Sequence, residues 1–274
     1  MSTDDHVLAR DLAAEAGRRL VALRARGGEP DLLRKAGDRL GHEFLTEALA
    51  AARPGDVVLS EEGADNPARL SAGRVWIVDP LDGTREFGEA GRTDWAVHVA
   101  LWERDPDAAR GLDAARGPDR TPGPDGAPGR LTAGAVALPA QDRVLSTANP
   151  AAPPPPEAGA PVRIVVSRTR APRFVRDISD LTGAELVPMG SAGAKVAAVV
   201  LGQADAYVHG GGFYEWDTAA PVAVARAAGL HASRIDGSPL RYNQPQLLMP
   251  DILVCRPALA NNLLQAIREV TDAH

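Results

Sequence analysis

The chain has 274 residues, 45% of them hydrophobic and 24% charged, and its formal net charge at pH 7 is −6. This composition supplies apolar material for one large or two modest globular domains, so it excludes disorder of the whole chain. The negative charge leaves no broad basic surface, which excludes a nucleic-acid polymer as an expected partner. A small anionic substrate can still bind through a bound cation.

Membrane and export segments are not expected. The longest apolar runs, such as residues 197–201, are far shorter than the roughly 18 to 20 residues that span a bilayer. Asp4 and Asp5 stand where a secretory signal would have lysine or arginine. Cys255 is the only cysteine, which excludes an internal disulfide and suits a reducing compartment. We therefore expect a cytoplasmic protein.

Two amphipathic helices open the chain. Apolar residues recur at three- and four-residue spacing within residues 7–23 and again within 40–49, which predicts a helix with one buried face in each segment. Asp38 precedes the second helix and is a candidate N-cap. Runs rich in β-branched and aromatic residues follow and predict an antiparallel sheet: residues 57–59, 75–78, 95–102, 131–138 and 143–147.

Two segments interrupt this pattern. Residues 104–130 are rich in Gly, Pro and Asp, and they have almost no apolar side chains to offset the entropy of ordering them, which predicts a mobile hairpin insertion. The proline run 153–156 predicts a stiff linker over residues 150–161. We expect this linker to divide an N-terminal α+β metal-binding lobe, residues 1–149, from a C-terminal lobe, residues 162–274.

Strands and helices alternate in the second lobe. Strand patterns occur at residues 162–166, 186–187, 204–209 and 251–255, and helix patterns at 172–181, 191–201, 218–228 and 257–271. Such alternation predicts an α/β lobe.

The loop Asp79-Pro80-Leu81-Asp82-Gly83-Thr84 is the first candidate for chemistry. Asp79 and Asp82 follow an apolar strand directly, so their carboxylates, with the carbonyl of Leu81, offer the hard oxygen ligands that Mg²⁺ prefers. Gly83 permits a backbone conformation closed to other residues, and Thr84 then begins a helical turn whose free amides can face a phosphate.

Each acidic segment also has a simpler interpretation. The loop alone could be a surface Asp-Gly hairpin turn. It also resembles the loop of phosphatases that form an aspartyl-phosphate, but their two aspartates are two residues apart and these are three apart. Glu61 and Glu62 could be solvated surface charge, and Asp217 could be the N-cap of a helix.

Taken together, the segments resemble the inositol monophosphatase superfamily. The resemblance rests on three motifs in order: Glu61-Glu62, Asp79 to Thr84, and Trp216-Asp217. Within the superfamily, the segments 76–87 and 190–195 look most like the CysQ-type 3′(2′),5′-bisphosphate nucleotidases. This branch implies an α+β fold, a layered αβαβα sandwich with the active site between two lobes. It also implies hydrolysis of adenosine 3′,5′-bisphosphate, or its 5′-phosphosulfate analogue, in sulfur assimilation, with inhibition by lithium.

The resemblance also assigns residues by position. It implies two Mg²⁺ ions, and it leaves a third open because Lys35 stands where the wider family has threonine. The implied catalytic residues are Asp38 and Thr84, which orient the attacking water, and Glu61. The implied metal ligands are Glu61, Asp79, the carbonyl of Leu81, Asp82 and Asp217. The implied substrate contacts are Asp82, Gly83, Thr84, Ser167, Arg170, Ser191, Lys195 and Asp217.

Several alternatives stay open at this point. An inositol monophosphatase or fructose-1,6-bisphosphatase would share every metal ligand, and a non-catalytic nucleotide sensor would share the cleft. Lys195 could instead be a surface residue with its stem on an apolar helix. His98, His209 and His231 show no ligand spacing and are interpreted as structural. A homodimer is a family-level expectation.

Overall fold

The computed structural model describes residues 4–105, 121–122, 128–169 and 171–272. The first half contains α1 (Asp5–Ala25), α2 (Pro30–Ala52), β1 (Val57–Ser60), the 3-10 helix η1 (Pro67–Leu70), β2 (Arg74–Asp82), α3 (Thr84–Gly88), β3 (Ala96–Arg104), β4 (Thr121–Pro122), β5 (Pro128–Leu138), η4 (Pro139–Gln141) and β6 (Arg143–Ser146). The second half contains β7 (Arg163–Ser167), α4 (Arg173–Thr182), β8 (Glu185–Met189), α5 (Ala192–Val200), β9 (Ala206–His209), β10 (Phe213–Tyr214), α6 (Glu215–Ala227), β11 (His231–Ser233), β12 (Leu248–Met249), β13 (Ile252–Cys255), η5 (Pro257–Leu259) and α7 (Ala260–Asp272).

Helix α2 begins eight residues before the predicted N-cap Asp38, so that prediction was wrong. Glu29 is the N-cap, and its side chain accepts a hydrogen bond from the backbone N–H of Leu32 at 2.9 Å. Pro30 occupies the first helical turn, where a missing N–H costs nothing. Leu32 is 66% exposed and Leu33 is only partly buried, so the first turns contribute little to the apolar face from which the helix start was predicted. Asp38 instead lies on a side of the helix from which it reaches Thr84.

The first sheet has the order β1-β2-β3-β5-β4, with β6 paired to β5. The prediction of a wholly antiparallel sheet was wrong for β1, which runs parallel to β2, with Ser60 opposite Val78. A parallel pair needs a long connection, and residues 61–73, including η1, provide it. Because the strands are parallel, their carboxyl ends meet at one edge. This places Glu61 beside Asp79.

The second sheet has the order β11-β13-β9-β7-β8. Strand β7 is parallel to both β8 and β9, and β13 is antiparallel to β9 and β11. Strands β10 and β12 form a separate antiparallel pair. In the chain, β10 comes directly before α6 and β12 follows β11. The C-terminal lobe is therefore a mixed sheet with helices, in agreement with the predicted α/β alternation.

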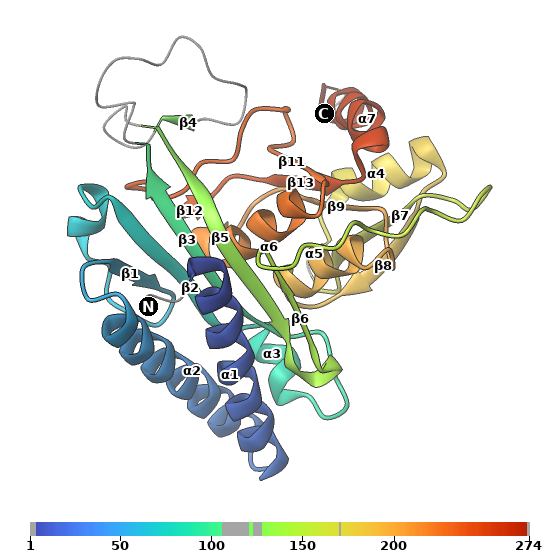
Figure 1. Ribbon diagram of the computed structural model, residues 1–274. Helices are drawn as coiled ribbons and strands as arrows, with labels where there is room; N and C mark the ends of the chain where they lie inside the picture. The colour runs from blue at the N-terminus through green and yellow to red at the C-terminus, as the bar shows by residue number, and fades with distance from the viewer. Residues whose placement is uncertain (1–3, 106–120, 123–127, 170, 273–274) are drawn as a thin grey trace.

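The helices and the two sheets are stacked in layers (Figure 1), and apolar clusters lie between these layers. One cluster lies between the helix pair α1 and α2 and the first sheet. A second lies between the other face of that sheet, helices α5 and α6, and the second sheet. A third joins the second sheet to α4 and α7. The predicted αβαβα sandwich is confirmed.

The predicted insertion at 104–130 lies mostly outside the described residues, apart from Arg104, Asp105 and the short strand β4, which pairs antiparallel with β5. The predicted linker at 150–161 has no helix or strand, and the Pro154 carbonyl accepts a hydrogen bond from Arg256 at 2.7 Å. The division into lobes at this linker stays a prediction, since the central apolar cluster contains residues from both sides of it.

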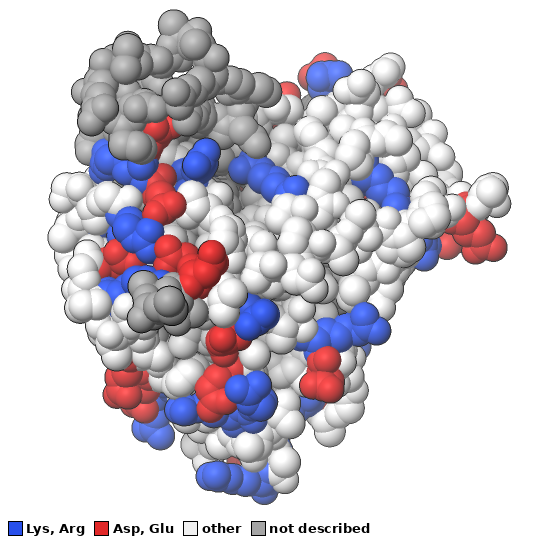
Figure 2. Space-filling view, viewed as in Figure 1, with Lys and Arg blue, Asp and Glu red and all other residues white. Residues whose placement is uncertain are grey.

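The surface charges are mixed in sign. On the face shown in Figure 2, Lys and Arg side chains lie among Asp and Glu side chains, and no broad basic patch forms among the described residues of that face. Within the described ranges, no helix is both long enough and apolar enough to cross a bilayer.

Candidate metal centre

Asp79 and Asp82 lie at the carboxyl end of strand β2. Residues three apart on a regular strand face opposite sides of the sheet. The pairing of β2 with β3 is irregular between Asp79 and Asp82, and such an irregularity can turn a side chain to the other face. Gly83 ends the strand at φ +82°, and a Cβ there would lie 3.0 Å from the Ser191 Cβ. The positive φ therefore favours glycine, and a larger residue would also have to displace the Ser191 side chain.

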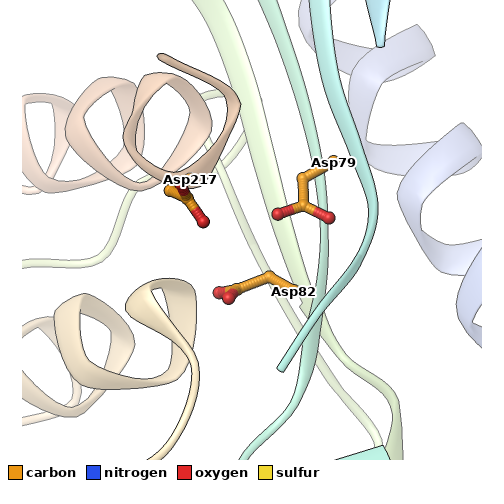
Figure 3. A group of neighbouring side chains, drawn as sticks. All are labelled: Asp79, Asp82 and Asp217. Atoms are coloured by element: carbon orange, nitrogen blue, oxygen red, sulfur yellow. The ribbon is translucent and has the colours of Figure 1, made fainter. Parts of the chain in front are cut away.

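Asp217 completes the group from the start of helix α6. It is the third helical residue, not the N-cap, and it accepts a hydrogen bond from the backbone N–H of Tyr214. One carboxylate oxygen from each of Asp79, Asp82 and Asp217 lies within 4.8 Å of the others. Figure 3 shows the three carboxylates directed toward one another. Residues 135 positions apart in sequence are thus joined into one acidic centre.

Two carboxyl groups of this centre, those of Asp79 and Asp217, are destabilised as anions by burial and by neighbouring negative charge. Burial and then the charge of Glu61 raise the pKa of Asp79 well above its ordinary value. Burial and then the charge of Asp82 raise the pKa of Asp217 to about 6. The Oδ2 atom of Asp79 is buried without a hydrogen-bond partner among the described residues. A divalent cation would give this oxygen a partner and remove the repulsion, so the donor set fits a hard metal ion.

Asp82 is the exception, since its pKa is lowered. Burial alone would raise it, but His98, Ser191 and Lys195 lower it to about 2. The Ser191 hydroxyl donates to Asp82, as do the backbone N–H groups of Ala192 at 3.2 Å and Gly193 at 2.6 Å. The first turn of α5 therefore stabilises this carboxylate as an anion.

Glu61 follows strand β1 and belongs to the same acidic group. The residue as a whole is solvent-exposed, whereas its carboxyl group is largely buried beside the other carboxylates. Burial of this group and then the charge of Asp217 raise the pKa of Glu61 to about 7. Its carboxyl group adds a fourth acidic side chain at the edge where β1 and β2 end.

Asp38 and Thr84 lie side by side. The Thr84 hydroxyl lies 3.3 Å from Oδ1 of Asp38 and 3.0 Å from the carbonyl oxygen of Leu81, and it can donate to either. Burial and then the charge of Glu62 raise the pKa of Asp38 to about 6. A carboxylate of this pKa is suited to accept a proton near neutral pH.

A cavity of about 720 Å³ opens beside the acidic centre. All but one of the predicted substrate contacts line it: Asp82, Gly83, Thr84, Ser167, Ser191, Lys195 and Asp217. The exception, Arg170, lies outside the described residues. The preceding Arg168 and Thr169 do line the cavity, and Arg168 pairs with Glu86 at 2.8 Å.

Lys195 is not a surface residue. Its side chain is 5% exposed, and Nζ donates to the carbonyl oxygen of Ser191 at 2.8 Å. Nζ also lies 5.3 Å from the centre of the Tyr207 ring, a cation–π distance. Burial lowers its pKa. This places a cationic side chain in the wall of the cavity.

Two histidines contribute more to the site than the sequence indicated. His98 is fully buried, with Nε2 3.2 Å from Oδ2 of Asp82, and His209 lines the cavity. Burial alone would lower the pKa of His98, but the charge of Asp82 raises it above its ordinary value. Side chains alternate between the two faces of a sheet along residues 96–102, so the sequence assigns His98 to one face. Only the pairing of β3 with β2 shows that Asp79 lies on the same face as His98. His231 lies elsewhere, 2.8 Å from the Ser233 hydroxyl.

Several known proteins are similar to this chain in sequence or in structure. The chain is 49% identical to 3′-phosphoadenosine 5′-phosphate phosphatase of Mycobacterium leprae over 97% of this chain and 94% of that protein. It is 30% identical to 3′(2′),5′-bisphosphate nucleotidase CysQ of Escherichia coli over 76% and 78%. Its structure resembles CysQ from Bacteroides thetaiotaomicron, with a TM-score of 0.72 and 26% identity over 92% and 97% of the two chains.

The family match covers most of the described chain. Residues 9–106 and 128–272 match the inositol monophosphatase family, and they include every acidic residue of the centre. The chain belongs to the inositol monophosphatase family, as its three acidic motifs predicted.

Proposed function

We propose that this protein is a Mg²⁺-dependent 3′(2′),5′-bisphosphate nucleotidase that hydrolyses adenosine 3′,5′-bisphosphate to AMP and phosphate. The observation that carries the proposal is the clustering of Asp79, Asp82 and Asp217 within 4.8 Å, beside a cavity of nucleotide size. The substrate is inferred from the Mycobacterium leprae relative, which is named for this activity and is 49% identical. The 5′-phosphosulfate analogue is a second substrate of the same class.

Glu61, Asp79, the carbonyl of Leu81, Asp82 and Asp217 would hold two Mg²⁺ ions. Bound magnesium lowers the pKa of a water molecule and neutralises charge on the phosphoryl oxygens. The number of ions follows the family resemblance, and the buried, unpartnered oxygen of Asp79 supports at least one.

The residues around the metal ligands would orient the attack. Asp38 accepts the proton of the attacking water, which the Thr84 hydroxyl helps to align. The bond from water oxygen to phosphorus forms as the bond from phosphorus to the 3′-oxygen breaks, and the 3′-oxygen takes up a proton. The backbone amides of Gly83 and Thr84 would hold the phosphoryl oxygens. Because water attacks the phosphorus directly, no covalent intermediate with the enzyme is needed.

The rest of the substrate would lie in the cavity. Ser167 and Ser191 offer hydroxyl groups, and Lys195 offers a cation for the phosphate that is not cleaved. Arg170 stays a predicted contact. A cytoplasmic location and a homodimer are likewise retained as proposals.

Phosphate release from a substrate panel tests the proposal. The panel contains adenosine 3′,5′-bisphosphate, inositol 1-phosphate and fructose 1,6-bisphosphate, each with Mg²⁺, with Mg²⁺ and Li⁺, and with chelator. We expect the adenosine compound to have the highest kcat/KM, with activity lost in chelator and reduced by Li⁺. Preference for inositol phosphate or fructose bisphosphate would overturn the substrate. Binding without turnover would favour a sensor.

Two variants make the panel specific to the site. Asp79→Asn should abolish phosphate release because it removes a ligand at the centre of the group. Asp180→Asn, an exposed aspartate of α4, makes the same chemical change away from the site and should retain wild-type activity. Equal activity in the two variants would refute the assignment of the metal centre.

A further inference from the structure

His98 lies beside the acidic centre, where β2, α5 and α6 meet. It is the third residue of β3, it is completely buried, and no role for it follows from the mechanism above. A buried histidine in a sheet is commonly a packing residue, so the contacts of its two ring nitrogens decide whether it does more.

The strand register sets the position of the ring. His98 is the direct partner of Asp79 in the antiparallel pair of β2 and β3, and side chains of directly opposed residues lie on the same face of a sheet. Its neighbours at two-residue spacing, Ala96 and Ala100, belong to the apolar cluster between the two sheets. The ring therefore projects from the first sheet toward helices α5 and α6.

Each ring nitrogen meets a different element. Nδ1 donates to the backbone carbonyl of Trp216 at 3.0 Å, one residue before the metal-ligand candidate Asp217. Nε2 lies 3.2 Å from Oδ2 of Asp82 on β2, which is an ion-pair distance without hydrogen-bond geometry. Nδ1 is also 3.9 Å from Oδ2 of Asp79.

Helix α5 packs closely against the ring of His98. A Cβ on Gly193, in the first turn of α5, would lie 2.0 Å from Nε2 of His98. Glycine at this position lets the ring approach α5, and the N–H of the same Gly193 also donates to Asp82. The ring thus fills the space between β2, α5 and α6, and contacts a polar atom of two of them.

We infer that His98 is a positioning residue for the metal centre: its two nitrogens join Asp82 on β2 to the carbonyl before Asp217 on α6 and so fix the separation of these two ligands. The inference rests on the proposed function, because it requires that the carboxylates bind metal. Groups that contact metal ligands from behind fix their orientation, and replacing them typically weakens metal binding about 10- to 100-fold. An aliphatic side chain of similar size would fill the space but contact neither polar group.

Two substitutions and one control separate positioning from packing. His98→Leu keeps the volume and removes both polar contacts, and His98→Gln keeps one amide donor. His231→Leu removes a half-buried histidine from β11, an edge strand of the second sheet, and serves as the matched control. Binding of Mg²⁺ to the metal-free proteins is measured by calorimetry, together with their unfolding temperatures and the kcat and KM for adenosine 3′,5′-bisphosphate.

We expect His98→Leu to raise the Kd for Mg²⁺ about 10-fold or more, with a larger change in the Mg²⁺ needed for half-maximal activity than in KM at saturating Mg²⁺. His98→Gln should recover part of the affinity, and His231→Leu should match the wild type. If His98→Leu does not fold, the Kd of folded His98→Gln decides the question in the same way.

Two results overturn the inference, and they are distinguishable. A folded His98 variant whose Kd for Mg²⁺ stays within about 2-fold of the wild type, below the effect expected for such groups, refutes positioning and leaves the proposed function intact. A wild-type protein that binds no Mg²⁺ refutes the metal centre itself, and the role of His98 with it.

Discussion

The replacement Asp217→Asn should make the metal-free protein more stable at pH 8 while it abolishes the response to Mg²⁺. The carboxyl group of Asp217 has a pKa of about 6 in the folded chain, against an ordinary value of 3.8. This difference corresponds to about 3 kcal/mol of unfavourable free energy when the group is ionised in the folded state. Asparagine removes the charge and keeps the shape of the side chain.

The gain in the free energy of unfolding is smaller than this because the substitution weakens one hydrogen bond. Asp217 accepts from the backbone N–H of Tyr214, and a neutral amide oxygen accepts less strongly than a carboxylate by about 1 kcal/mol. We therefore expect a net gain of about 2 kcal/mol at pH 8. For a chain of this size that is a rise of roughly 4 to 8 °C in the unfolding temperature.

The size of this gain in stability depends on pH. Because the folded-state pKa of Asp217 is raised, the penalty is absent below the ordinary value of 3.8 and is complete above about 6. The advantage of Asp217→Asn should therefore shrink as the pH falls from 8 to 5. Scanning calorimetry in chelator at both pH values, repeated with Mg²⁺ at pH 8, measures each effect.

Three results would refute this reasoning. They are a metal-free Asp217→Asn that is less stable than the wild type at pH 8, an equal effect at pH 5 and pH 8, or an unchanged stabilisation by Mg²⁺. Asp180→Asn, on the exposed surface of α4, controls for a general effect of removing one negative charge.

Three further predictions follow from the site. The affinity for Mg²⁺ should fall as the pH drops from about 8 to 6, because Glu61, with a pKa of about 7, takes up a proton that competes with the metal; calorimetry that shows no such change would contradict this. Gly83→Ala should lower the free energy of unfolding by about 1–3 kcal/mol and lower activity, since its Cβ would crowd Ser191 at a positive φ. Gly183→Ala, at φ +71° with open space around it, should lower the free energy of unfolding by about 1 kcal/mol and keep full activity. Denaturant unfolding measures the stability of both variants, and rate measurements without denaturant give their activity. Asp38→Asn should lower kcat about 100-fold or more with the Kd for Mg²⁺ within a few-fold of the wild type; a matching loss of metal affinity would make Asp38 a ligand instead.

Local features of the sequence predicted the chemistry of the candidate site. The ligand types, their order along the chain and the glycine after Asp82 are local features, and each carries a physical reason that needs no partner segment. Helices α1 and α6 and most strands also follow from local periodicity, because burial on one face repeats with the period of the element. These signals were enough to predict the layered fold and the acidic centre.

The tertiary structure decided how these parts meet. The parallel pairing of β1 with β2, which brings Glu61 to Asp79, depends on the path of a connection that has no periodic signal. The anchoring of Asp82 by the first turn of α5, and the place of His98 behind it, depend on strand register and on packing between segments about 100 residues apart. Periodicity reports which face of an element is buried, but not which element covers it, and so the sequence predicted the ligands while only the folded chain revealed what holds them.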